Sequence, residues 1–215
     1  MTPPFIITID GPAGSGKGTL ARALAAHLGF DHLDTGKIYR RVGYDLLKAG
    51  QDPHHEPSAL IAANRLTSSL TPEMLSDPAL RDDAAGNAGS VVASMPSVRA
   101  ALLEAQRQFA RRATKGAVLD GRDCGTVICP EAPVKFFVIA RPDVRARRRV
   151  DELSAMGLPA VYDDVLKDIL ARDERDIHRP IAPLKPAPDA ILLDTSDISA
   201  EAVFNRALSD IARFL

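Results

Sequence analysis

The chain has 215 residues, of which 46% are hydrophobic and 26% charged, so it can bury the core of one α/β domain and is not a disordered chain. Its 27 basic residues nearly balance 28 acidic ones, which argues against a protein that binds nucleic acid through net charge. Two cysteines are too few for a disulfide framework, and no apolar run reaches the roughly 18 residues of a membrane span. With no signal peptide visible, we expect a cytoplasmic protein.

Short apolar runs alternate with amphipathic helical patterns along the chain. The first run, residues 5–9, is continuous, as in a parallel strand buried on both faces, and it ends at Asp10. Further strands are predicted at residues 30–33, 117–119, 134–139 and 190–193. Helices are predicted at residues 19–28, 38–47, 98–109 and 200–215. Two more are predicted between them, one that starts at residue 143 and a separate one that ends at about residue 175. This alternation predicts a doubly wound parallel sheet.

Two stretches interrupt the alternation. Residues 51–97 are rich in Ala, Ser, Asp and Pro without any alternating period, which predicts short helices and loops in a mobile insert. Residues 176–188 contain four prolines and are predicted to be a loop, following a charged helical region that fits a lid. Lids exclude water from a site where phosphoryl transfer competes with hydrolysis. The expected division is a core of residues 1–50, 98–145 and 188–215, an insert at 51–97 and a lid at 146–187.

A glycine-rich loop joins the first strand to the first helix. Its residues are Gly11, Pro12, Ala13, Gly14, Ser15, Gly16, Lys17, Gly18 and Thr19. A strand before it and a helix after it are the context that a phosphate-binding P-loop requires. Glycines let backbone N–H groups surround phosphate oxygens, the helix N-terminus adds partial positive charge, and Lys17 reaches the outer phosphates. One departure is that Gly18 follows the lysine, so the hydroxyl comes one position later, at Thr19.

A P-loop by itself does not define a function. The Asn-Lys-x-Asp motif that reads guanine is absent, and so is the glycine-rich signature of transporter ATPases. Phosphoryl transfer between small molecules is therefore the favoured reaction. A nucleotide-binding switch without turnover remains an alternative.

Arginine dominates the basic residues, with 20 arginines against 7 lysines. A kinase whose acceptor is itself a phosphate must bring two polyanions together, and it needs no general base because the second phosphate pKa is near 6. Candidates for the converging cations are Arg40, Arg99, Arg122, Arg148, Arg172, Arg175 and Arg179, besides Lys17. Five arginines between Arg141 and Arg149 fit such a cleft or, alternatively, a solvated helix face.

At this level of detail the sequence resembles a known family. The loop with glycine after its lysine is similar to nucleoside monophosphate kinases. Residues 33–40 (LDTGKIYR), 120–127 (DGRDCGTV), 172–176 (RDERD) with Arg179, and 87–90 (NAGS) with Arg99 resemble bacterial cytidylate kinases. The resemblance runs from about Ile6 to the C-terminus. It implies ATP-dependent, magnesium-assisted phosphorylation of CMP and dCMP.

The resemblance also implies roles for individual residues. Gly11 to Thr19 would hold ATP, and Asp120 would hold a magnesium-bound water, with the Thr19 hydroxyl as a further candidate at the metal. Thr35 and Asp123 would face the cytosine, whose amino group suits a carboxylate acceptor. The remaining positions implied are Arg99 and Arg179 beside the base, Ser90, Arg172 and Asp176 at the sugar, Arg40 and Arg122 at the CMP phosphate, and Arg148 over the transferring phosphoryl group. The catalytic set would be Lys17, Arg122, Arg148 and Arg179.

The sequence departs from the family in its insert. Family members usually carry a small set of β-strands there, whereas residues 51–86 show no strand pattern, so a trimmed, helical insert is expected. UMP, AMP or a sugar acid remain alternative acceptors, although Asp123 favours a base that bears an amino group. Heptads and large apolar stripes are absent, so we expect a monomer that acts on small molecules, with no nucleic-acid or membrane partner.

Overall fold

The computed structural model describes residues 3–214, so the chain ends assigned to the core at residues 1–2 and 215 lie outside the described part. Its centre is a sheet of five parallel strands in the order β2-β3-β1-β4-β5. These strands are β1 (Phe5–Asp10), β2 (Asp31–Asp34), β3 (Gly116–Gly121), β4 (Val134–Ile139) and β5 (Ile191–Asp194). The order is that of a doubly wound sheet, which confirms the predicted fold class.

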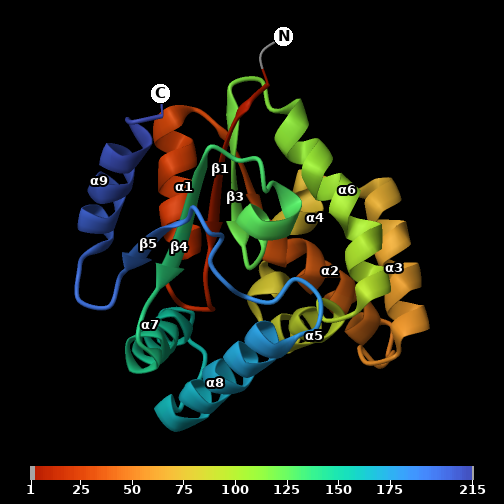
Figure 1. The fold of residues 1–215 in the computed structure, drawn as a ribbon. Helices are drawn as coiled ribbons and strands as arrows, with labels where there is room; N and C mark the ends of the chain where they lie inside the picture. Colours follow the sequence, from red (N-terminus) through yellow and green to blue (C-terminus); the bar gives the residue numbers. More distant parts are fainter. Residues whose placement is uncertain (1–2, 215) are drawn as a thin grey trace.

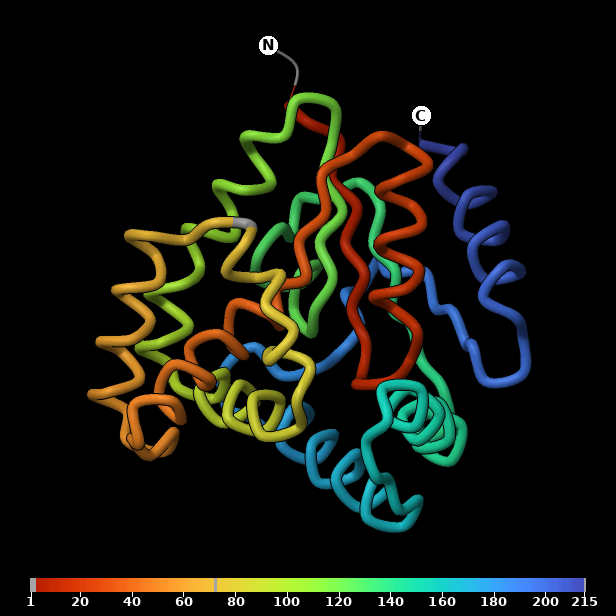
Figure 2. The backbone as a smooth tube through the Cα atoms, turned by 180° about the vertical axis from the view of Figure 1, so that it is seen from behind, coloured from red at the N-terminus to blue at the C-terminus, as the bar shows by residue number. Residues whose placement is uncertain are grey.

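Helices cover both faces of the sheet (Figure 1). On one side lie α1 (Lys17–Leu28) and α9 (Ala200–Ile211), and on the other α2 (Thr35–Lys48), α3 (Glu56–Ser69) and α6 (Pro96–Arg112). The insert is completed by α4 (Pro72–Ser76), the 3-10 turn η1 (Pro78–Arg81) and α5 (Asp83–Val92). Helices α7 (Pro142–Ala155) and α8 (Tyr162–His178) lie beyond the end of the sheet toward which β4 points. Figure 2 shows the same arrangement from behind.

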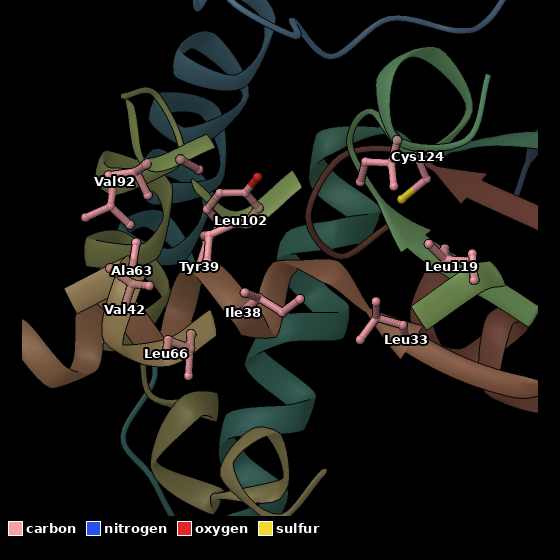
Figure 3. Close-up of a cluster of buried hydrophobic side chains, with 14 of the residues drawn as sticks. Leu33, Ile38, Tyr39, Val42, Ala63, Leu66, Val92, Leu102, Leu119 and Cys124 are labelled. Carbon is pink, nitrogen blue, oxygen red and sulfur yellow. The ribbon is translucent and has the colours of Figure 1, made fainter. Parts of the chain in front are cut away.

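Two hydrophobic clusters hold these layers together. Because side chains alternate along a strand, β1 serves both clusters: Ile7 and Ile9 pack with α1 and α9, while Ile6 packs on the α2, α3 and α6 side. In Figure 3 the second cluster joins Leu33 and Leu119 of the sheet to the helical side chains of the insert. Strands buried on both faces explain the near-continuous apolar runs in the sequence.

Most predicted elements are present, with small differences at their ends. No strand lies between residues 51 and 97, so the helical character expected for this stretch is confirmed. The predicted start of the loop at residue 176 is wrong, because α8 continues to His178. The next residue, Arg179, precedes Pro180, and a residue before proline disfavours the helical conformation. The last helix ends at Ile211, short of the predicted 215. None of the helices formed by residues 3–214 has the length and apolar character needed to cross a membrane.

Candidate active site

The glycine-rich loop leads from the end of β1 into α1, which begins at Lys17. Gly14 and Gly16 have φ angles of 73° and 87°, in the left-handed region that glycine adopts without strain. Gly16 is also the N-cap of α1 and offers no side-chain cap, so the first backbone N–H groups of the helix remain available to an anion. The half-buried Lys17 donates from Nζ to the Pro12 carbonyl at 3.3 Å.

A cavity of about 930 Å³ opens over this loop. Of the nine loop residues, the cavity is lined by Ala13, Gly14, Gly16, Lys17, Gly18 and Thr19. The other three, Gly11, Pro12 and Ser15, do not line the cavity. A Cβ on Gly11 would lie 2.0 Å from the Val138 carbonyl oxygen, and the Ser15 carbonyl accepts a 2.9 Å hydrogen bond from Thr195 Oγ1.

Charged and apolar side chains both line this cavity. Arg148 of α7 is one of the charged residues and donates from Nη1 to Thr195 Oγ1 at 2.9 Å, which ties this arginine to the threonine that also binds the loop. The apolar side chains include Leu20 and Ala23 of α1, Val203 and Phe204 of α9, and Val165 of α8. Such a site suits a ligand that carries phosphates at one end and a flat apolar group at the other.

A second cavity, of about 440 Å³, lies beside the first. All nine residues assigned to the acceptor line it, although they come from α2, α5, α6, α8, the segment after β3 and the residue that follows α8. They are Thr35, Arg40, Ser90, Arg99, Arg122, Asp123, Arg172, Asp176 and Arg179. The structure therefore brings together residues that are as much as 144 positions apart in the chain (Thr35 to Arg179, 179 − 35 = 144).

Paired charges organise the inner end of this second cavity. The buried Asp123 carboxylate accepts a short hydrogen bond from Arg99 and lies 3.5 Å from Nη2 of Arg179. Arg122 donates from Nε to Asp176 at 2.6 Å. Tyr39 lies under Arg99, with the guanidinium 5.4 Å from its ring centroid, and also lines the cavity. Buried ion pairs of this kind present both acceptors and donors to a polar ligand.

Positive charge is in excess where the second cavity meets the first. The buried Nε atoms of Arg40 and Arg172 have no hydrogen-bond partner within residues 3–214. Burial lowers the pKa of the Arg172 guanidinium, and the neighbouring Arg122 and Arg40 lower it further. Buried polar groups are normally paired, so these atoms indicate a place for an anion.

The two cavities share part of their lining. The residues common to both are Lys17, Gly18, Arg22, Arg40, Arg81, Arg122, Glu152 and Arg172. Six of these eight carry a guanidinium group or an ammonium group, and because they line both cavities they lie where the two cavities meet: Lys17, Arg22, Arg40, Arg81, Arg122 and Arg172. Burial lowers the pKa of Lys17 to about 7, and Arg122 adds to the effect. A highly charged phosphoryl group would restore the ammonium form of Lys17.

Two aspartates lie under the site. Asp120 of β3 forms a 2.8 Å contact between Oδ1 and Nε2 of His32, and its Oδ2 faces Gly18 at the start of α1. Burial raises the pKa of Asp120, and the nearby Asp34 raises it further. Asp10 is fully engaged with the protein, because its carboxylate accepts the backbone N–H groups of Cys124 and Gly125, each at 2.8 Å.

The hydroxyl of Thr35 is hydrogen-bonded within the protein. Its Oγ1 donates to the carbonyl of Asp120 at 2.9 Å and lies 3.7 Å from the sulfur of Cys124. The side chain still lines the second cavity, so the remaining lone pair of the oxygen is what it can offer to a ligand.

Comparison with known proteins identifies the family. The family model described as cytidylate kinase matches residues 7–213. The chain belongs to the cytidylate kinase family. It is 56% identical over 208 residues to the "Cytidylate kinase" of Paramagnetospirillum magneticum, covering 96% of this chain and 97% of that one. A further relative, the "Cytidylate kinase" of Rhodospirillum rubrum, is 53% identical, with 97% of both chains covered.

Solved structures support the fold of this family member. A gluconokinase from Sinorhizobium meliloti superposes with a TM-score of 0.53 at 14% identity, covering all of this chain and 95% of that one. TT1252 from Thermus thermophilus gives a TM-score of 0.50 at 22% identity, covering all of this chain and 99% of that one. At such identities the likeness concerns the fold and not the substrate.

Sequence reasoning missed several residues that shape the site. Thr195 joins the loop to Arg148, and Asp10 holds the five-residue π-helical turn η2 (Cys124–Ile128) that follows Asp123. Each acts through contacts between segments far apart in the chain, which no local pattern displays. A π-helical turn is rare, and such turns occur frequently at functional sites.

Proposed function

We propose that the protein transfers the terminal phosphoryl group of ATP to CMP and dCMP, giving CDP or dCDP and ADP. ATP would bind in the larger cavity, with its phosphates on the backbone of residues 13–19 and its base against the apolar side chains of α1 and α9. The acceptor would bind in the smaller cavity, with its base at Asp123 and its phosphate near Arg40, Arg122 and Arg172. Membership of the cytidylate kinase family supports both assignments.

The cations between the cavities would do most of the chemical work. The acceptor phosphate is its own nucleophile, so no general base is required. Lys17 and Arg122 line both cavities and would neutralise the charge on the transferring group, together with Arg148 from the donor side. Holding both reactants in one orientation accounts for a large part of such a barrier reduction.

The base-reading end would use the pairs already formed in the protein. Asp123 is held by Arg99 and lies close to Arg179, so its carboxylate is fixed in orientation. A cytosine amino group can donate to that carboxylate, whereas the O4 of uracil cannot. Ser90 and Asp176 would then face the sugar, and Thr35 the edge of the base.

Magnesium would be held mainly by phosphate oxygens and water. Within residues 3–214, no three His, Cys, Asp or Glu side chains come together as an ion-binding group. The donor set nearby consists of the Asp120 carboxylate beside Gly18 and the exposed Thr19 hydroxyl. This fits a cation that retains waters and binds through few protein ligands, with Asp120 accepting from a bound water. Magnesium would neutralise charge on the phosphates of ATP.

The observation that carries this proposal is the adjacency of the two cavities across the shared cations. A nucleotide switch needs the first cavity but has no use for the second. The test is ADP release with ATP and Mg²⁺, measured against CMP, dCMP, UMP, AMP, GMP and dTMP. We expect strong turnover with CMP and dCMP and little with the others.

Other outcomes of this panel each overturn a defined part of the proposal. Strong turnover with another acceptor would retain the kinase chemistry and refute the cytosine assignment. ADP release that no acceptor stimulates would refute the kinase reaction and favour the switch. We expect this enzyme to be a monomer, to act in the cytoplasm and to bind no nucleic acid. Gel filtration tests the oligomeric state.

A further inference from the structure

One buried arginine outside the assigned site joins three parts of the molecule. Arg145 of α7 is only 3% exposed. Its Nε donates to the Ala140 carbonyl at 2.9 Å, which fixes the guanidinium against the end of β4. Its Nη1 donates to the carbonyl of Ala13 in the P-loop at 3.1 Å. The same Nη1 and Nη2 donate to the Asp173 carboxylate of α8, at 3.0 Å and 2.5 Å.

These contacts connect the donor loop to the helix that carries the acceptor residues. Asp173 directly follows Arg172 and lies three residues before Asp176, and both of these neighbours line the second cavity. Ala13 lines the first cavity. The guanidinium thus sets the distance between the loop under the donor phosphates and the helix over the acceptor.

Helix α7 packs closely against the P-loop around Arg145. A Cβ placed on Gly14 would lie 3.1 Å from Cβ of Arg145, so α7 packs directly on the loop. The three nitrogens of Arg145 make four hydrogen bonds, two of them from Nη1. These donors are spread over three nitrogens of a planar fork, a geometry that the single ammonium nitrogen of lysine does not reproduce.

We propose that Arg145 and Asp173 are a positioning pair, which holds α8 and its acceptor-side residues in register with the P-loop. The pair touches neither substrate in this proposal. It acts on the alignment of the donor and acceptor phosphates, where a displacement of about 1 Å costs on the order of a hundredfold in rate. The kinetic part of this inference rests on the proposed function; the mechanical part does not.

The test compares Arg145→Lys with Arg147→Lys. Arg147 lies on the same helix but is 70% exposed and makes only a 3.9 Å contact with Asp143, so it is a matched control. Below the unfolding temperature of each variant, we expect Arg145→Lys to lower kcat at least about tenfold while the KM for CMP changes less than about threefold. Arg147→Lys should retain the wild-type kcat. A further variant, Asp173→Glu, keeps the carboxylate and should recover more of kcat than Asp173→Asn.

A second readout does not depend on turnover. In hydrogen exchange, binding of ADP at the P-loop should protect the backbone amides of α8 in the wild type and in Arg147→Lys. In Arg145→Lys that protection should be lost, although ADP still binds. If the pair served stability alone, Arg145→Lys would unfold more easily but keep kcat and the protection of α8, and this result would overturn the inference.

The experiments distinguish a failure of the proposed reaction from a failure of the positioning role of Arg145 and Asp173. Wild-type protein that turns over no acceptor refutes the proposed reaction, while the exchange of α8 still decides the positioning role. If the wild type also failed to bind ADP, exchange in the free proteins would decide it. Faster exchange of α8 in Arg145→Lys than in Arg147→Lys would support the pair, and equal exchange would refute it.

Discussion

Gly43 of α2 and Gly89 of α5 lie at the point where these two helices cross. A Cβ on Gly43 would lie 2.7 Å from the backbone nitrogen of Gly89, and one on Gly89 would lie 2.8 Å from Cα of Arg40. The backbones therefore touch, as only glycine allows. This contact brings Arg40 and Ser90, one from each helix, to the same cavity.

Replacing Gly43 should separate these helices. Overpacking costs about 1–3 kcal/mol, and the better helix propensity of alanine returns up to about 1 kcal/mol, so Gly43→Ala should lose about 1–2 kcal/mol of stability. Gly86→Ala on α5 is the control, because its Cβ would meet only the end of Arg172 at 3.5 Å. Urea unfolding should show the first variant destabilised and the second unchanged or stabilised. Equal stability of Gly43→Ala and the wild type would show that the helices separate freely.

Lys17 should take up a proton when nucleotide binds. Its pKa in the free protein is lowered to about 7, mainly by burial, so at pH 8 roughly nine in ten molecules carry the neutral amine. Phosphate charge raises that pKa again, so binding of MgATP at pH 8 should take up close to one proton and binding at pH 6 nearly none. Calorimetry in two buffers of different ionisation enthalpy measures this uptake.

Lys17→Arg provides the control for proton uptake, because a guanidinium stays charged throughout this range. The variant should bind nucleotide without uptake at pH 8. Uptake that persists in Lys17→Arg would assign the proton to another group. In turnover, Lys17→Ala should lose at least about a hundredfold in kcat while the fold remains intact.

Arg172 should lower the stability of the free protein while it strengthens the binding of the acceptor. Its guanidinium is half-buried beside Arg122 and Arg40, and its Nε has no hydrogen-bond partner among the described residues, so the free protein bears a cost that a bound phosphate relieves. Arg172→Gln should raise the free energy of unfolding by about 1 kcal/mol and raise the KM for CMP at least about tenfold. Thermal unfolding with and without CMP measures both effects. Loss of stability in the variant would show that Asp176 compensates the charge already.

Local signals made part of this structure predictable. The P-loop is contiguous, so residues 11–19 could be placed from spacing and from the apolar strand before them. The helical insert followed from the lack of any two-residue period between 51 and 86. The arginines of the acceptor site were candidates from charge alone, but their separate roles, and the polar residues Thr35, Ser90 and Asp176, were identified only through family resemblance, since these residues share no local pattern.

Other features depend on tertiary contacts and had no signal in the sequence. Arg145 belongs to a run of five arginines, and nothing in that run separates the buried Arg145 from the exposed Arg147. The end of α8 was misplaced because prolines were read as the start of the loop. A proline constrains only the residue before it, so the helix could continue to His178.

The central claim is that the buried Asp123, held by Arg99, selects cytosine. The most direct test is the ratio of kcat/KM for CMP to that for UMP, in the wild type and in Asp123→Asn. One good pair of this kind is worth about 1–3 kcal/mol, so the ratio should fall by about ten- to a hundredfold. Asp176→Asn, which alters an equally buried carboxylate assigned to the sugar, should lower both values together and leave the ratio unchanged. An unchanged ratio in Asp123→Asn would contradict the account.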